Sequence, residues 1–521
     1  MRSRTVGLLP RAPARPSATP RLLPRPSSAA SPRCLSSAPL AHPLSPVREP
    51  STPGFGQPLP STHPHLLAPG ELTRGISADE YEQRRKRLMD GLEEGAVVIV
   101  AGGRLKYASG KILYVLLRCV HLGWQAAHDP PRAETRRSKT ETDAAFSSYK
   151  FRQESNFWYL TGFEEPDSVL VLEKISTLRG YKMTMFVRSK DNTDEAWNGA
   201  RSGREGAIDV FGADDATDIS MLAPRLKSIL NSGASSSRPS LQPIYVDFEG
   251  VPSSSRRFSK PKTSLFDFLV PTGRSLDEAD EVAALLTSSG RQVKSASGAI
   301  EKLRLIKSPA EIKVMRRAAD ISSDAHAKVS LGLESLTLSR SLSRSIQVMR
   351  FCEPTSVSGR TESSLVSHFE YTTSLAGSDR PAYVPVCASG PSSLTIHYIS
   401  NRLPLKDGEL VVLDAGCEWG GYASDITRTF PISGKFSSAQ RDLYQAVLNV
   451  QKACIELCTE EVGVSMERLH RKSVDVMRVE LINLGFQMRG GDLERTIYPH
   501  FLTHPLGIDL HDTPGFSRGE K

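Results

Sequence analysis

The sequence of 521 residues lacks several motifs that would assign a chemistry at once. It contains no GxSxG elbow, no P-loop and no GxGxxG, which leaves a serine hydrolase or a nucleotide-dependent enzyme without support. It also lacks HExxH, so a thermolysin-type zinc protease is excluded. No apolar run approaches the roughly 18 residues that are needed to span a bilayer. We therefore expect a protein without a membrane span that uses none of these common sites.

Cysteine is scarce, and its spacing predicts neither disulfides nor a zinc site. The seven cysteines include no CxxC pair. Cys454 and Cys458 fall on a predicted helical stripe together with Leu443, Val447 and Val450. We therefore expect them to be buried, reduced packing residues.

Acidic residues are missing from the start of the chain, where much of the net charge of +8 lies. Eight arginines precede the first acid: Arg2, Arg4, Arg11, Arg15, Arg21, Arg25, Arg33 and Arg48. This segment is rich in Arg, Ser, Ala, Pro and Leu without a continuous apolar core, which is typical of an organelle import presequence rather than a secretory signal. A proline-rich disordered tail is the alternative. The remainder is close to neutral and has no basic stripe, so nucleic acid is not an expected partner.

The length and the pattern of helix and strand signals predict an arm and two folded domains. We assign residues 1–65 to the presequence and a disordered arm, 66–290 to a first domain and 300–521 to a second. Segments at about 111–150 and 329–347 fit poorly with their surroundings, and we interpret them as loop insertions or retained intronic sequence.

In the first domain, Ser77-Ala-Asp-Glu80 resembles a capping box ahead of a helix through Leu88. β-Branched runs predict strands at Ala96–Ala101, Ser168–Leu172, Met183–Val187 and Pro243–Phe248.

In the second domain, Ser308-Pro309-Ala310-Glu311 is a strong helix start, and Ile312, Met315, Ala319 and Ser322 are expected to trace one face of the helix. Two further helices are expected, from Ser437 to about Cys458 and from Ser465 to Leu484.

The segment from Leu410 to Phe430 reads as two β-rich runs around a Trp419-Gly420 turn, which predicts a hairpin. Asp414 and Asp425 are equally far from that turn, so we expect them opposite each other on one face. Two facing carboxylates in an apolar strand context repel each other, and a cation would reverse the sign of this interaction. Alternatively, a bulge shifts the register and both aspartates are turn or surface residues.

Three histidines, His500, His504 and His511, lie within a dozen residues, where nearby prolines exclude a continuous helix. In an extended chain His500 and His504 face the same side, so one could bind a metal while the other contacts substrate. The position of His511 depends on an intervening turn. His397 follows Leu394-Thr-Ile, a β-branched run. A histidine buried in a strand is therefore the alternative to a functional role for His397. We interpret His326, His368 and His470, all in helical contexts, as packed or surface residues.

These motifs resemble those of aminopeptidase P and prolidase-like enzymes of the M24 family. The likeness rests on DAG followed by DITRTFP, on the His-x-x-x-His-x-x-Gly-x-x-x-His-Asp run, on FWYLTGF from Phe157, and on RPAYVP from Arg380. It implies an α+β architecture: a creatinase-like α/β domain followed by a pita-bread domain. It further implies a hydrolase with two divalent ions, commonly manganese, held by Asp414, Asp425 and His504, with His397, His500 and His511 contacting substrate and transition state.

With an import presequence, the likeness extends to the mitochondrial members of the family that trim an N-terminal residue from imported proteins. The expected partners are peptide or protein N-termini. The sequence does not decide whether the protein forms a homo-oligomer. The family completes its site with two glutamates in segments beyond the last histidine. This sequence ends at Lys521, so we expect an incomplete, truncated metal site in which Glu520 is no substitute. A non-catalytic peptide-binding protein and an Xaa-Pro dipeptidase are the alternatives.

Overall fold

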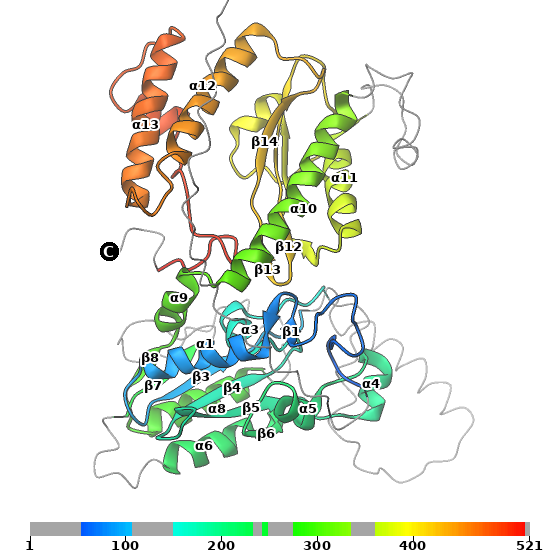
Figure 1. The fold of residues 1–521 in the computed structure, drawn as a ribbon, viewed down its shortest axis with the longest axis vertical. Coiled ribbons are helices and arrows are strands. Elements are labelled where there is room, and N and C mark those ends of the chain that lie inside the picture. The colour runs from blue at the N-terminus through cyan, green and yellow to red at the C-terminus, as the bar shows by residue number, and fades with distance from the viewer. Residues whose placement is uncertain are drawn as a thin grey trace, which may run out of the picture. The chain divides into compact units, whose positions relative to one another are not determined.

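The computed structural model describes residues 50, 54–106, 149–232, 242–247, 275–334 and 360–515 (Figure 1). The predicted import presequence lies outside these residues, as do most of the insertions predicted at 111–150 and 329–347 and the last residues up to Lys521. Within the described ranges, no helix is both long and apolar enough to cross a membrane.

The first domain is built on a mixed sheet of six strands in the order β6-β5-β4-β3-β7-β8. The pairs β3–β4 and β4–β5 are antiparallel, and the other three pairs are parallel. The strands are β3 (Val97–Ala101), β4 (Val169–Lys174), β5 (Tyr181–Val187), β6 (Asp215–Asp218), β7 (Ile244–Asp247) and β8 (Val293–Ser295). All four strands predicted for this domain are confirmed within one or two residues.

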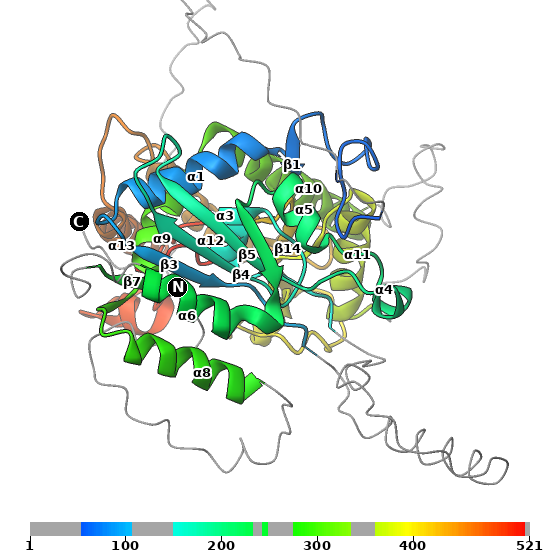
Figure 2. The same ribbon diagram turned by 90° about the horizontal axis from the view of Figure 1, so that it is seen from below.

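Helices cover both faces of this sheet, because its central strands alternate two sets of apolar side chains (Figure 2). On β3, Val98 and Val100 pack against one helical layer, and Val97 and Ile99 pack against the other. The first layer holds α1 (Ala78–Asp90), α3 (Ser155–Thr161), α5 (Gly203–Asp209) and α9 (Ser297–Leu305). The second holds α6 (Leu222–Ser232) and α8 (Ser275–Ser288).

Short elements connect these layers. They are β1 (Glu71–Thr73), β2 (Ile76–Ser77), α4 (Asn192–Asn198) and the 3₁₀ helix η2 (Ile219–Met221). The predicted start of α1 is confirmed, because the Ser77 hydroxyl accepts a hydrogen bond from the Glu80 amide at 3.2 Å.

The second domain begins with α10 (Pro309–Glu334), whose predicted cap is confirmed. The Ser308 hydroxyl accepts from the Glu311 amide at 3.1 Å, and the Glu311 carboxylate accepts from the Ser308 amide at 2.7 Å. The face traced by Ile312 and Ser322 is not uniformly buried, since Ile312 is 45% exposed although Ser322 is buried. The face that packs inward instead holds Val314, Ala318, Ile321, Ala325 and Val329. Apolar residues occupy neighbouring stripes of this helix, and only its contacts with α11 and β12 select one of them.

Two small antiparallel sheets follow, in the orders β10-β11-β14 and β13-β12-β9. The strands are β9 (Arg380–Pro381), β10 (Val386–Ser389), β11 (Leu410–Asp414), β12 (Cys417–Trp419), β13 (Tyr422–Ala423) and β14 (Thr427–Pro431). The helices of this domain are α11 (Glu362–Leu375), η6 (Gly390–Leu394), α12 (Ser438–Ile455), α13 (Met466–Asn483) and η7 (Leu493–Ile497).

Helices α12 and α13 pack side by side and agree with the two predicted helices (Figure 1). The predicted stripe of α12 is only half right. Val450 and Cys454 are buried, whereas Leu443 and Val447 are exposed. Cys458 is exposed and lies beyond the helix end, so its predicted burial is wrong. A periodic pattern identifies a helix, but the partner on each side of the helix decides how wide its buried face becomes.

The core of the first domain extends onto the second. Val314 of α10 and Tyr422 of β13 belong to the same apolar cluster as the side chains of α1 and α3. The buried Arg84 of α1 donates to the Tyr422 hydroxyl at 3.2 Å and lies 3.4 Å from the Glu311 carboxylate.

Candidate active site

The hairpin that carries the two aspartates is confirmed, but its predicted register is wrong. Strands β12 and β13 pair Trp419 with Tyr422, so the turn is Gly420-Gly421 and not Trp419-Gly420. Both glycines have positive φ, 57° and 78°, as the central residues of a tight hairpin turn require. Asp414 therefore pairs with Thr427 in the β11–β14 ladder, and Asp425 lies in the segment between β13 and β14.

The two aspartates nevertheless meet through a tyrosine. The hydroxyl of Tyr383, which follows β9, contacts Asp414 Oδ1 closely and lies 3.1 Å from Asp425 Oδ1. Both carboxylates are half-buried. The chain passes from one small sheet to the other between Asp414 and Cys417, and again between Ala423 and Thr427. The strand register is therefore shifted, as the alternative prediction proposed. The second part of that alternative is wrong, because the two aspartates stay together and do not become separate surface residues.

The pKa shifts at this pair reflect burial and the hydrogen bonds of the two carboxylates. Burial, reinforced by the charge of Asp425, raises the pKa of Asp414 against the opposing hydrogen bond from Tyr383. Burial and then the two carboxylates raise the pKa of the Tyr383 phenol, so it stays protonated. Burial alone would raise the pKa of Asp425, but hydrogen bonds from His504 and Tyr383 outweigh it and hold that pKa below its usual range.

His504 and His511 lie beside the aspartates. His504 Nε2 is 3.2 Å from Asp425 Oδ2, and the hydrogen bond to this carboxylate raises the pKa of His504. The rings of His504 and His511 meet edge to face, with centroids 4.4 Å apart. His504 Nδ1 lies 3.1 Å from the Pro505 carbonyl oxygen. An Nδ1–H that donates to this carbonyl leaves Nε2 as the nitrogen directed at the acidic pair, which is the usual arrangement of a metal-ligating histidine.

His500 and His397 are exposed. The His500 ring packs edge-on against Tyr498, with centroids 4.9 Å apart. His397 follows η6 in a turn, so the alternative of a buried strand histidine is wrong. Within the described ranges, no hydrogen bond, ion pair or ring contact joins either histidine to the aspartates.

Two of the histidines interpreted as packing residues do pack. His326 of α10 is buried, its Nε2 is 2.9 Å from the Ala415 carbonyl oxygen, and its ring meets Phe369 edge-on. Burial lowers the pKa of His326, so the neutral ring acts as support for the backbone next to Asp414. His470 stacks on Phe501, with centroids 4.4 Å apart.

The chemistry of the gathered donors fits a divalent ion. Two carboxylates and one imidazole are ligands that manganese and zinc both accept. The Tyr383 hydroxyl bridges the aspartates and His504 pairs with Asp425, so among the described residues no three acidic, histidine or cysteine side chains surround one common point. Asp414, Asp425 and His504 are instead linked in pairs, the aspartates through the Tyr383 hydroxyl and Asp425 directly with His504.

The sequence pattern missed the partners of these residues. Tyr383 lies inside the RPAYVP motif, but nothing local says that its hydroxyl reaches both aspartates. Asp509, Asp512 and Arg304 were not singled out either, although a buried ion pair joins Arg304 to Asp512. Of these three residues, only Asp512 could have been noticed in the sequence, because it directly follows His511.

Comparison with known families assigns both halves of the chain. Residues 313–521 match the model of metallopeptidase family M24, and residues 135–237 match the N-terminal domain of aminopeptidase P. The chain belongs to the aminopeptidase P group of family M24, whose members are hydrolases that use a dinuclear divalent metal.

Individual relatives place the chain more finely within this group. It is 36% identical to intermediate cleaving peptidase 55 of Saccharomyces cerevisiae over 466 residues, which is 89% of this chain and 76% of the yeast protein. It is 35% identical to Xaa-Pro aminopeptidase 3 of Rattus norvegicus, over 91% of this chain and 79% of the rat protein. It is also 31% identical to an intermediate cleaving peptidase 55 of Arabidopsis thaliana that is named as mitochondrial, over 88% and 73% of the two chains.

The crystal structure of the yeast peptidase, lacking its 58 N-terminal residues, matches with a TM-score of 0.63 and 33% identity, over 86% of this chain and 84% of that chain. The predicted α+β architecture, an aminopeptidase P-like domain followed by a pita-bread domain, is thereby confirmed.

Proposed function

We propose that the chain is a metallo-aminopeptidase that removes N-terminal residues from peptides or imported mitochondrial proteins through water activated by two divalent ions, with manganese as the metal. The observation that carries the proposal is the line of contacts that runs from Asp414 through the Tyr383 hydroxyl to Asp425, and on to His504 and His511. Residues 66–290 form the first domain and 300–521 the catalytic domain in this proposal.

The position of each side chain in the site suggests its role in the proposed reaction. Asp414, Asp425 and His504 would hold the metal, and the carbonyl of Pro505 keeps the His504 ring oriented. Metal held there would supply a water molecule of lowered pKa and polarisation of the scissile carbonyl. His511, in contact with the His504 ring, donates to the oxygen that becomes negative in the transition state. His397 and His500 are exposed, which leaves both rings available to the peptide.

The proposed location and substrate rest on the arm and on the relatives. The arginine-rich, acid-free first 48 residues have the composition of an import presequence, and the Arabidopsis relative is named as mitochondrial. The rat relative is named as an Xaa-Pro aminopeptidase, and the yeast relative is named as an intermediate cleaving peptidase. Protein N-termini, with or without proline at the second position, are the proposed partners.

The test uses the full chain, stripped of metal by a chelator and titrated with MnCl₂. Substrates are two unblocked peptides that differ only in proline or alanine at the second position, an N-acetylated form of each, and the corresponding dipeptides. Asp425→Asn tests the site, and Asp407→Asn, an exposed aspartate outside it, is the matched control.

We expect manganese-dependent release of the N-terminal residue from the unblocked peptides, detected by mass spectrometry. Asp425→Asn should lower kcat/KM at least about hundredfold, because the charge that holds the ion is lost, and Asp407→Asn should match the parent. Peptide binding without metal uptake or cleavage would establish a non-catalytic binding protein instead. Cleavage confined to Xaa-Pro dipeptides would establish a dipeptidase.

A further inference from the structure

The segment that carries His504 and His511 contains no helix and no strand from His504 to Thr513, which we call the histidine loop. Two backbone hydrogen bonds shape it, from the Gly507 amide to the Asp509 carbonyl at 3.1 Å and from the Asp512 amide to the Pro505 carbonyl at 3.0 Å. The Gly507 carbonyl accepts from the Ala423 amide of β13 at 2.8 Å. The Pro505 carbonyl orients the His504 ring within the loop, but so few backbone hydrogen bonds leave the place of the loop as a whole dependent on side-chain contacts.

The carboxylate of Asp512, next to His511, is the most deeply buried charge of the loop. Its side chain is 1% exposed, and both its oxygens are paired: Oδ1 with Arg304 and Oδ2 with Lys307 at 2.9 Å. Oδ1 also lies 3.4 Å from the Asp509 amide nitrogen. A carboxylate at this depth is tolerated only when it is paired and hydrogen-bonded, so its partners determine where the loop can lie.

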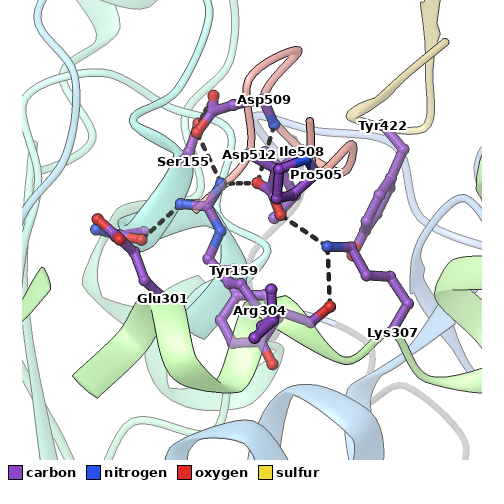
Figure 3. Close-up of polar contacts among 12 residues, drawn as sticks. Ser155, Tyr159, Glu301, Arg304, Lys307, Tyr422, Pro505, Ile508, Asp509 and Asp512 are labelled. Atoms are coloured by element: carbon purple, nitrogen blue, oxygen red, sulfur yellow. Dashed lines mark hydrogen bonds and ion pairs between the residues drawn. The ribbon is translucent and has the colours of Figure 1, made fainter. Parts of the chain in front are cut away.

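Asp509 ties the same loop to the first domain at a second point. Its carboxylate is 2.7 Å from Arg304 Nη2 and 3.3 Å from Arg152 Nη2, and it accepts a hydrogen bond from the Ser155 hydroxyl. Figure 3 shows the Arg304 guanidinium between Asp509 and Asp512, with Lys307 on the other side of Asp512. One guanidinium thus joins both acidic side chains of the loop.

Arg304 is itself held rigidly on its far side. Its Nη1 donates to Asn156 Oδ1 at 2.7 Å, and Asn156 donates in turn to Asp247 at the end of β7, also at 2.7 Å. The Arg304 side chain is 4% exposed. A polar chain therefore runs from the central sheet of the first domain through α3 and α9 into the loop that carries the two histidines.

We propose that Arg304 is a positioning residue of the histidine loop, which acts through Asp509 and Asp512 to hold His504 and His511 against Asp425. Helix α9, which carries Arg304 and packs with α1 and α3 on the sheet of the first domain, thereby contributes to the geometry of a site whose candidate residues all lie beyond α10. This inference rests on the proposed function for its catalytic meaning, but its structural consequence can be measured without any activity.

The experiment compares Arg304→Met, which removes the charge, with Arg304→Lys, which keeps the charge but cannot place one nitrogen at the two loop carboxylates and a second at Asn156. Arg291→Met is the matched control. Arg291 is also buried, and among the described residues its side chain donates to the backbone carbonyls of Gln242, Pro243 and Gly95, away from the loop. Hydrogen–deuterium exchange of the full chain, with and without Mn²⁺, follows the amides of residues 504–513.

We expect exchange in the histidine loop to rise about tenfold in Arg304→Met and about threefold or less in Arg304→Lys, because local opening is governed by the contacts that are lost. Arg291→Met should lower the melting temperature without a selective change in the loop. On an unblocked peptide substrate, Arg304→Met should lower kcat about tenfold or more with KM within about twofold, since small displacements of catalytic groups are costly.

Loop exchange equal to the parent in Arg304→Met, or an equal increase in Arg291→Met, would overturn the proposal. The result also separates this inference from the proposed function. A chain without metal uptake or peptidase activity would refute the function, while a selective change in loop exchange would still support Arg304 as the anchor of the loop.

Discussion

At the scale of single residues, the feature that distinguishes the site is one hydroxyl between two carboxylates. The Tyr383 hydroxyl contacts both Asp414 and Asp425, but it has only one hydrogen to donate. Only one carboxylate can accept it at a time, and the other faces an oxygen lone pair. A cation would relieve this crowding of oxygens, so the tyrosine couples the stability of the pair to metal binding.

Tyr383→Phe tests this coupling. The metal-free chain should lose about 1 kcal/mol of unfolding free energy, because a half-buried hydrogen bond disappears while the aspartates still repel. The rise in melting temperature on adding MnCl₂ should then be larger than in the parent, as measured by differential scanning fluorimetry. Tyr398→Phe is the control, since its hydroxyl donates to Glu362 at 2.9 Å away from the aspartates. Equal metal-induced shifts in both variants would contradict the coupling.

At the scale of elements, the turn of the β12–β13 hairpin determines where the aspartates lie. Gly421 has a φ of 78°, and a Cβ there would come within 2.6 Å of the Trp158 ring. The turn therefore presses directly on the FWYLTGF helix of the first domain. Two separate constraints, the backbone conformation and the close approach of an aromatic ring, require glycine at this position.

Gly421→Ala should destabilise the chain by about 3 kcal/mol, the sum of the positive-φ penalty and the clash with Trp158. Gly463→Ala separates the two causes, because Gly463 also has a positive φ, 57°, but a Cβ there would meet nothing within 4 Å. That control should lose only about 1 kcal/mol. Urea unfolding curves measure both values. A loss of the same size at both positions would mean that the contact with Trp158 costs nothing.

At the scale of the whole molecule, the buried guanidinium of Arg84 also joins the two domains. The Arg84 side chain is fully buried between the rings of Tyr81 and Tyr159, and it pairs with Glu80 of its own helix and Glu311 of α10. Its Nη1 donates to the Tyr159 carbonyl at 3.2 Å. Removal of Arg84 would leave the Glu311 carboxylate, itself 2% exposed, without this cation.

Arg84→Met should therefore cost about 3 to 5 kcal/mol, the usual result of breaking a buried pair from one side. Circular dichroism melts should show a lower and broader transition, since the coupling between the domains is weakened. Arg179→Met is the control. Arg179 pairs with Glu82 and Asp214, which are both largely exposed, so its loss should cost about 1 kcal/mol or less. Similar losses for the two variants would argue against a special role of Arg84.

The sequence by itself determined the features whose physics is local. Ser77 and Ser308 cap their helices as predicted, and Ser437 and Ser465, predicted only as helix starts, are caps as well, because a cap depends on residues within one turn. The β-branched runs became strands, and the prolines around His504 excluded a helix. The type of site was also readable, since two aspartates and a cluster of histidines lie close enough along the chain to suggest a metal.

Tertiary structure alone decided the hairpin register, the buried faces of α10 and α12, and the partners of the site residues. The turn centre differs by one residue from the prediction, and that small difference moves Asp414 opposite Thr427. Tyr383 lies 31 positions before Asp414, and Arg304 lies 208 positions before Asp512. Contacts over such separations depend on how whole elements pack, because no local pattern records which distant side chain will neutralise a buried charge.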